Sequence, residues 1–223
     1  MTEQVLELIP VRTRILTEKN NIIDVIEQYA KNDIGPYDIV SVAESVVAIT
    51  QGRFVRPEEL TPSWLARLLC RFVPQKGSLS SVYGMQTAIN AEGSCRVAWS
   101  MFLGMLGKLV GKNGLFYQLA GEQAALIDDV TGTMPPFDKC IVYGPDDPNG
   151  VAQAIKERLG CYGAVVADVN DLKRAAVLGV TQGVDPKEVA RILIDNPFGN
   201  ASQKTPIVII KNYALAARKA ATE

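Results

Sequence analysis

The chain of 223 residues suits one large domain or two small ones, and its 48% hydrophobic content supplies a sizeable core, so disorder is not expected. Because 23 Lys and Arg nearly cancel 24 Asp and Glu, overall charge predicts neither a nucleic-acid nor a membrane partner. The absence of histidine excludes Ser-His-Asp, Cys-His and His-ligated metal sites, which leaves carboxylate, amide, hydroxyl, Lys and Arg chemistry.

The first part of the chain predicts two strands around one helix. Apolar residues 5–9, which Pro10 follows, predict a short strand, and apolar spacings of three and four over residues 22–30 predict an amphipathic helix. Residues 38–43 predict a buried strand. The apolar run 46–49 beyond it is expected to form an exposed edge strand that leads into a turn.

The middle of the chain is rich in Gly and Ser. A helix is expected to start at Thr61-Pro62, with an inner face made of Trp64, Leu65, Leu68, Leu69 and Phe72. The weakly polar stretch 97–110 is shorter than the roughly 20 apolar residues of a membrane-spanning helix, so it predicts a buried helix. Gly104, Gly107 and Gly111 would allow another backbone to approach one flank of it, in a packed helix or a dimer contact.

The last third of the chain predicts alternating strands and helices. Strands are expected at 139–143, 164–167 and 206–210, and helices at 151–159 (ended by Gly160), 185–194 and 212–223. The fold class is therefore mixed α/β, or α+β. We expect a single domain over residues 1–223, or two lobes in which residues 1–75 pack with 139–223 and residues 76–138 form a Gly-rich insertion.

Cysteine usage and the N-terminal stretch bear on location. The four cysteines, Cys70, Cys95, Cys140 and Cys161, contain no CxxC pair, so we expect reduced thiols in the core. Residues 1–10 lack the basic segment and apolar run of a secretory signal. These features predict a cytoplasmic protein.

Three oxygen-bearing side chains, Asp168, Asn170 and Asp171, follow the predicted strand 164–167. Ligands are commonly held at strand ends in α/β folds, and such oxygens suit a divalent cation. The alternative is a turn in which Asp and Asn side chains bond their own backbone. Lys173 and Arg174 favour the first interpretation, because a metal-bridged polyphosphate needs cations beside its carboxylates.

Three other polar groups are candidates. The adjacent Asp128 and Asp129 are either solvated or a ligand site, and Glu92 is an isolated carboxylate that is either wet or paired. Polar residues also flank the run 46–49: Glu44, Ser45, Gln51 and Arg53. Neither GxxxxGK[ST] nor GxGxxG occurs, so nucleotide binding would need another kind of site.

Several stretches together resemble the coenzyme F420-0 γ-glutamyl ligase family. Residues 38–53 resemble its strand-plus-turn pattern D-V-L-V-V-x-x-K-x-V-S-K-x-E-G-R, and residues 145–152 resemble its P-x-D-P-D-x-S-A segment. Residues 164–168 resemble the strand before its S-D-T metal-binding turn. The chain departs from the family at Glu44-Ser45, where a Lys is usual, and keeps A-N-A-G-I-D-x-S-N only as residues 88–94.

The resemblance implies the family fold, with mixed sheets and flanking helices, and a GTP- and metal-dependent amide ligase. Such an enzyme activates a carboxylate as an acyl phosphate, which the amine of glutamate then attacks. It implies Mg²⁺ or Mn²⁺, GTP or another nucleotide, and a homodimer. The metal would be held by Asp168, Asn170, Asp171 and Glu92, with Asn90 nearby, and the phosphates by Ser45, Arg53, Lys173 and Arg174. The alternative is a non-catalytic ligand-binding or regulatory protein on the same fold.

Overall fold

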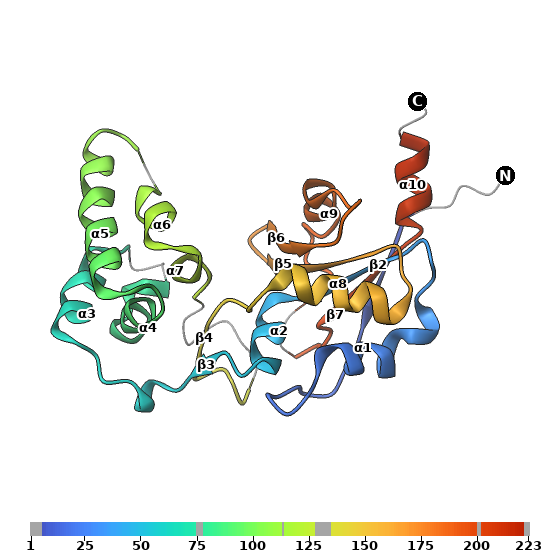
Figure 1. The fold of residues 1–223 in the computed structure, drawn as a ribbon, viewed down its shortest axis with the longest axis horizontal. Helices are drawn as coiled ribbons and strands as arrows, with labels where there is room; N and C mark the ends of the chain where they lie inside the picture. Colours follow the sequence, from blue (N-terminus) through green and yellow to red (C-terminus); the bar gives the residue numbers. More distant parts are fainter. Residues whose placement is uncertain (1–5, 75–77, 113, 128–134, 200–201, 221–223) are drawn as a thin grey trace. The chain divides into compact units, whose positions relative to one another are not determined.

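The computed structural model describes residues 6–74, 78–112, 114–127, 135–199 and 202–220 (Figure 1). The chain forms two compact units, unit 1 from residues 1–52 and 145–223 and unit 2 from residues 53–144. Unit 2 is therefore an insertion in unit 1, and it begins earlier and ends later than the lobe 76–138 expected from the sequence. The mixed α+β class is confirmed.

Unit 1 is built on a five-stranded mixed sheet in the order β1-β7-β2-β5-β6. Its strands are β1 (Glu7–Val11), β2 (Ile39–Ala43), β5 (Gly163–Asn170), β6 (Arg174–Val180) and β7 (Ile207–Lys211). β2 and β5 run parallel, and the other neighbouring strands pair antiparallel. The central strands are apolar runs because both faces of the sheet are covered.

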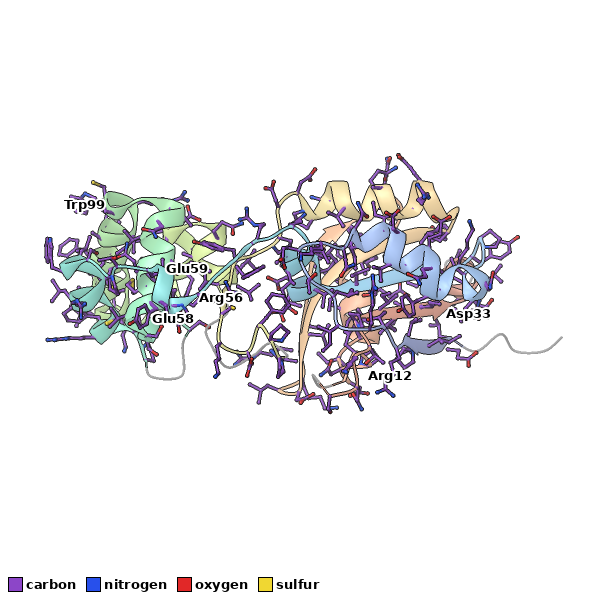
Figure 2. The ribbon with its side chains drawn as sticks, turned by 90° about the horizontal axis from the view of Figure 1, so that it is seen from below. Arg12, Asp33, Arg56, Glu58, Glu59 and Trp99 are labelled. Atoms are coloured by element: carbon purple, nitrogen blue, oxygen red, sulfur yellow. The ribbon has the colours of Figure 1, made fainter. Side chains whose placement is uncertain are left out.

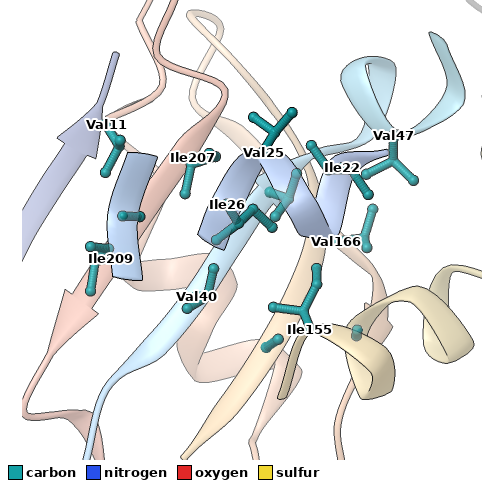
Figure 3. Packing of buried hydrophobic residues seen from close by; sticks show 14 of the residues in the cluster. Val11, Ile22, Val25, Ile26, Val40, Val47, Ile155, Val166, Ile207 and Ile209 are labelled. Carbon is teal, nitrogen blue, oxygen red and sulfur yellow. The ribbon is translucent and has the colours of Figure 1, made fainter. Parts of the chain in front are cut away.

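Helices cover both faces of this sheet. They are α1 (Ile22–Ala30), α2 (Glu44–Thr50), α8 (Pro148–Leu159), α9 (Pro186–Ile192) and α10 (Tyr213–Ala220). Ile26 of α1 and Ile155 of α8 pack on Val40 and Val166, as Figure 3 shows, and all four side chains are fully buried. Burying a side chain of this size stabilises the fold by roughly 1.5–3 kcal/mol. On the other face, α9 and α10 pack over a second cluster that includes Val165 and Ile210.

Unit 2 is mainly helical. It contains α3 (Trp64–Leu69), α4 (Val82–Glu92), α5 (Ser94–Leu109), α6 (Leu115–Ala120), α7 (Glu122–Leu126) and the two-stranded ribbon of β3 (Phe54–Val55) and β4 (Ile141–Val142). A Cβ atom at Gly104 would lie 2.8 Å from Phe116, and one at Gly107 would lie 2.9 Å from Leu115. α6 makes this close approach, so the packed-helix alternative is confirmed for these two glycines.

Three strand expectations also need correction. β1 continues through Pro10 to Val11, which is possible because β1 is an edge strand. The segment after β2 is the helix α2, because its apolar residues face the core with helical spacing, as buried Val47 shows. β6 was missed in a segment that was expected to be irregular, since its apolar residues begin with two small alanines and Gly179 interrupts them.

The helix near residue 61 differs from its predicted form. Ser63, whose hydroxyl accepts the Ala66 N–H at 3.2 Å, is the N-cap in place of Thr61. Trp64 and Phe72 were expected inside, yet they are 74% and 53% exposed. Leu69 is buried as predicted, and Ala66 and Cys70 complete the buried side. Likewise α5 was expected to be buried, and one face of it is exposed.

The described cysteines are all free thiols. Cys70, Cys140 and Cys161 are buried, as expected, and Cys95 is exposed. Burial raises the pKa of the Cys161 thiol, which keeps it protonated and unreactive. In the part of the chain that the structure describes, no helix combines the length and the apolar character needed to cross a membrane.

A buried carboxylate links two segments of unit 1. The Asp38 side chain, 3% exposed, accepts hydrogen bonds from the Gly35 N–H at 2.7 Å, the Asn212 N–H at 2.9 Å and Lys211 Nζ at 2.6 Å. It thereby joins the turn before β2 to the end of β7. Every acceptor is matched to a donor, which is the condition for burying a charge without a large penalty.

We predict that Asp38→Asn lowers the free energy of unfolding of unit 1 by about 3–5 kcal/mol, because it leaves the Lys211 ammonium unpaired. Lys31→Gln is the matched control, since the Lys31–Glu27 pair is 59% and 24% exposed and exposed pairs contribute about 0–1 kcal/mol. Urea unfolding of the two variants measures both effects. Equal losses in the two would contradict the role given to Asp38.

Candidate functional site

The carboxyl ends of β2 and β5 lie side by side in unit 1. Ala43 pairs with Ala167 at the end of the parallel ladder, α2 begins at the next residue of one strand, and Asp168 is the next residue of the other. Val47 of α2 and Val166 of β5 share the same core cluster, so α2 covers the face toward which Asp168 alternates. Asp168 and the first turn of α2 therefore share one edge of the sheet.

The Asp168 carboxylate is partly desolvated and has no partner among the described residues. Its side chain is exposed, and no described residue forms an ion pair or a hydrogen bond with it. Neighbouring protein atoms nevertheless remove part of its hydration, and this desolvation raises its pKa above the ordinary 3.8. A carboxylate that is partly dehydrated and lacks a cation is a candidate for binding one.

The next polar residues belong to a hairpin, so the strand does not end at Asp168 as expected. β5 runs to Asn170, Asn170 pairs with Arg174, and residues 171–173 form the loop, in which Lys173 is left-handed with φ +57°. Asn170 Oδ1 accepts the Leu172 N–H at 3.0 Å. This bond is the one that the turn alternative predicted, although it uses only one lone pair of the oxygen.

The hairpin is held by the loop that follows α9. Asn196 Nδ2 donates to Asp171 Oδ1 at 2.6 Å, and Lys173 pairs with Asp195. Asn196 Oδ1 is buried and has no hydrogen-bond partner among the described residues. Neither Asp195 nor Asn196 was singled out from the sequence, and because they follow a helix with no recognisable motif, only the structure brings them to the hairpin.

These donors fit a magnesium-type ion in a limited way. Asp168 and Asn170 are two residues apart on one strand, so their oxygens project to the same face. Within the described ranges, no three His, Cys, Asp or Glu side chains gather closely enough to hold a metal. Mg²⁺ commonly takes only one or two carboxylates and completes its shell with water and substrate phosphates. The Asp168 and Asn170 oxygens therefore suit a magnesium site whose other ligands are water and substrate phosphates.

The predicted phosphate ligands divide between the units. Ser45, half-buried, is the second residue of α2, and Arg174, exposed, begins β6. Both belong to unit 1, as does Lys173 with its partner Asp195. Arg53 belongs to unit 2, where its Nε donates to the Gly144 carbonyl at 2.6 Å and its Nη2 donates to Gln123 Oε1 at 2.9 Å.

Glu92 also belongs to unit 2, and its carboxylate is paired. Its side chain is 9% exposed, with Oε2 2.9 Å from Arg96 Nη1 and Oε1 accepting the Gln123 N–H at 2.9 Å. Gln123 lies in the first turn of α7, so Glu92 joins α4, α5 and α7. A Cβ atom at Gly121 would collide with this carboxylate. We therefore leave Glu92 and Arg53 out of the proposed site. Asp128 and Asp129 lie outside the described residues.

The side chain of the residue that follows α2 fixes the loop before α8. Gln51 Nε2 donates to the Asp146 carbonyl at 2.9 Å, and Gln51 Oε1 accepts the Asp146 N–H at 2.7 Å. Asp147, with φ +40°, then caps α8 through the Gly150 N–H at 2.9 Å. Gln51, a candidate for chemistry in the sequence, thus holds the Pro-Asp-Asp-Pro segment in place.

We predict that Glu92→Gln destabilises unit 2 by about 1–3 kcal/mol, because the charge-assisted bonds to Arg96 and Gln123 are weakened inside the unit. Urea unfolding followed by tryptophan emission reports on it, since Trp64 and Trp99 are the only tryptophans of the chain and both lie in unit 2. Mn²⁺ binding measured by calorimetry should stay unchanged in a folded variant. Loss of Mn²⁺ affinity without loss of stability would return Glu92 to the metal site.

We also predict that Asp168→Asn slightly stabilises the ligand-free protein at pH 7. A raised pKa means that the folded state disfavours the ionised carboxylate, so this penalty is present at neutral pH and disappears below the unfolded pKa near 3.8. The gain should stay below about 1 kcal/mol, because solvent screens an exposed group. Asp33→Asn, at an exposed aspartate of the same unit, is the control in thermal melts at pH 7 and pH 3. A gain that is equal at both pH values would contradict the explanation.

A comparison with known protein families covers both the candidate site and unit 2. The family model for F420-0:Gamma-glutamyl ligase matches residues 10–184. The match covers β2, α2, unit 2, α8, β5 and β6, and it supports a γ-glutamyl ligase-like function in general terms. A search of curated proteins found no match. Because the match spans well over half of the chain, the chain belongs to the F420-0:γ-glutamyl ligase family.

Proposed function

We propose that the protein is a nucleotide- and divalent-metal-dependent ligase that joins glutamate to a carboxylate substrate through an acyl phosphate. The observation that carries this proposal is the unpartnered Asp168 carboxylate at the shared carboxyl edge of β2 and β5, within the part of the chain that matches the ligase family. Ligands of α/β folds commonly bind at such an edge.

The proposed site uses residues of unit 1 alone. Asp168 and Asn170 would hold Mg²⁺ or Mn²⁺, with Asp171 as a neighbouring acceptor that Asn196 orients. The bound ion would neutralise phosphate charge during phosphoryl transfer. Arg174 has no ion-pair partner among the described residues and is available for phosphate oxygens. Lys173 would leave its ion pair with Asp195 and bind phosphate in its place. The Ser45 hydroxyl, at the start of α2, would orient the nucleotide or the acceptor carboxylate.

The proposed chemistry requires no imidazole. The substrate carboxylate attacks the γ-phosphorus of GTP or a related nucleotide, and the nucleoside diphosphate leaves. The amine of glutamate then attacks the acyl carbon, an amide bond forms and inorganic phosphate leaves. Positioning and charge neutralisation supply most of the catalysis in phosphoryl transfer, and carboxylates and basic side chains provide both.

A second candidate function is a non-catalytic nucleotide or ligand sensor on the same fold. The observation that favours it is Glu44-Ser45, which begins α2 where the family pattern has a Lys. An acidic residue in place of a basic one weakens phosphate binding next to Asp168. The two candidates make the same prediction for nucleotide binding and opposite predictions for glutamyl transfer. The homodimer implied by the resemblance stays a prediction that sedimentation velocity checks.

The proposal predicts that GTP with Mn²⁺ raises the melting temperature of the wild-type protein and of Asp33→Asn, and does not raise that of Asp168→Asn. By mass action, a ligand present at 100 times its Kd should stabilise the native state by about 2.7 kcal/mol. A stabilisation of this size is detectable in a thermal-shift screen. ATP and GDP, each with and without Mn²⁺, complete the screen. An undiminished shift in Asp168→Asn would place the site elsewhere.

Transfer is measured by mass spectrometry after incubation with F420-0, glutamate, GTP and Mn²⁺. Release of phosphate together with a product heavier by one glutamyl residue supports the ligase. Nucleotide binding without product supports the sensor, and no binding of any nucleotide overturns both candidates.

A further inference from the structure

Exposed apolar side chains are concentrated on the helices of unit 2. Of the 17 large apolar side chains that are exposed in the described parts of the chain, 13 lie between Trp64 and Leu119. Leu109 is 83% exposed, Trp64 74%, Val110 73% and Trp99 64%. Soluble monomers rarely display apolar surface at this density unless something covers it.

The exposed residues of α5 form one stripe. They recur at spacings of three and four along the helix and its C-terminal end: Trp99, Phe102, Leu103, Leu106 and Val110. Val97, Ser100, Met101 and Gly107 are the buried residues, and they lie on the opposite side. Figure 2 shows Trp99 pointing away from the ribbon. α5 is therefore apolar on two sides, of which the core of unit 2 uses only one.

α3, which packs beside α5, and the short 3₁₀ turn Cys70–Phe72 that directly follows α3 combine apolar and basic side chains on their exposed face. Trp64, Arg67, Leu68, Arg71 and Phe72 follow the same spacing of three and four, and all five are exposed. Among the described residues, neither arginine has an ion-pair partner. Aromatic residues alternating with unpaired arginines suit a boundary between an apolar and an anionic phase.

The charges around these helices have one sign. Residues 60–121 contain six Lys and Arg but a single acidic residue, Glu92, whose side chain is 9% exposed and paired with Arg96. Lys108 and Lys112 flank the exposed end of α5. Glu58 and Glu59 precede this segment, and Glu59 pairs with Arg56 (Figure 2). The exposed charges on α3 and α5 are thus all positive.

From this surface we infer that α3 and α5 dock unit 2 on an anionic lipid membrane, with the apolar stripe of α5 in the headgroup region and the basic side chains on lipid phosphates. An amphipathic helix lies in the interface in this way without crossing it. The inference replaces the sequence-based expectation of no membrane partner, which rested on the net charge of the whole chain. Attraction between basic residues and an anionic surface acts only over a short distance, so it depends on the local charge of α3 and α5 and not on the net charge of the chain.

Charge sign argues against two other occupants. A second copy bound face to face would place Arg67 and Arg71 against a surface on which α3 and α5 offer no exposed acidic residue to receive them. Nucleic acid would satisfy the arginines but leave the aliphatic residues Leu106, Leu109 and Val110 in water. Anionic lipid satisfies both sets.

The chain carries its own probe for this surface. Its only two tryptophans, Trp64 and Trp99, both lie on it, so intrinsic emission reports on docking without a label. The experiment titrates the full chain with vesicles of phosphatidylcholine alone or mixed with phosphatidylglycerol. We expect a shift of emission to shorter wavelength and quenching by brominated lipid with the mixed vesicles only, and loss of both in high salt.

The double variant Arg67→Glu/Arg71→Glu should weaken binding to mixed vesicles at least about 25-fold, because each basic residue near an anionic surface contributes about fivefold. Lys187→Glu/Arg191→Glu, which reverses two exposed charges on α9 of unit 1, is the matched control and should bind like the wild type. Leu106→Asp should abolish quenching by brominated lipid, and circular dichroism checks that each variant is folded.

Three results would overturn the inference. The first is no emission change with mixed vesicles, and the second is equal binding to neutral vesicles. The third is a dimer, seen by sedimentation velocity, that Leu106→Asp dissociates and that shows no vesicle binding. This last result would assign the stripe to a second copy of the chain.

Discussion

The parallel pairing of β2 with β5 is the constraint on which the rest of the structure depends. It joins residues 39–43 to residues 163–167, all of them buried or nearly so, and parallel strands can be joined only by a long crossover. Here the crossover contains α2, the whole of unit 2 and α8. Gln51 and Asp146 bond to each other where the chain leaves and re-enters unit 1, so the two ends of the insertion are held together between α2 and α8.

The parts of the fold that the sequence predicted best are those in which burial acts on a continuous run. β2 and the first half of β5 are apolar on both faces, and α8 has a proline at its start and Gly160, with φ +65°, after its end. The failures have one cause, which is that an apolar pattern does not say which partner covers it. The apolar run from Val46 to Ile49 is compatible with a strand or a helix, and packing against the core beside Val166 favours the helix. In α3 and the turn that follows it, Trp64 and Phe72 were assigned to the core, while the structure buries the smaller Ala66 and Cys70 beside the correctly predicted Leu69.

The candidate site was predictable to the extent that it is local in sequence. Asp168 follows an apolar run, and the structure places it at the edge shared by β2 and β5. Asn170 and Asp171 were expected at a strand end, and they close a hairpin in which part of their bonding capacity serves the backbone and Asn196. Glu92 and Arg53 could not be assigned from sequence, because their partners Arg96, Gln123 and Gly144 come from the folding of unit 2. An isolated carboxylate in the sequence indicates that a partner exists but does not identify the partner residue.

Net charge averages over regions that differ. Residues 60–121 hold six basic residues and one acidic residue, so the rest of the chain holds 17 basic and 23 acidic residues. A chain of net charge −1 is therefore an acidic protein with a basic helical segment inserted in it. A local surface of one sign responds to the charges near it, so the net charge of the whole chain does not report on the basic segment.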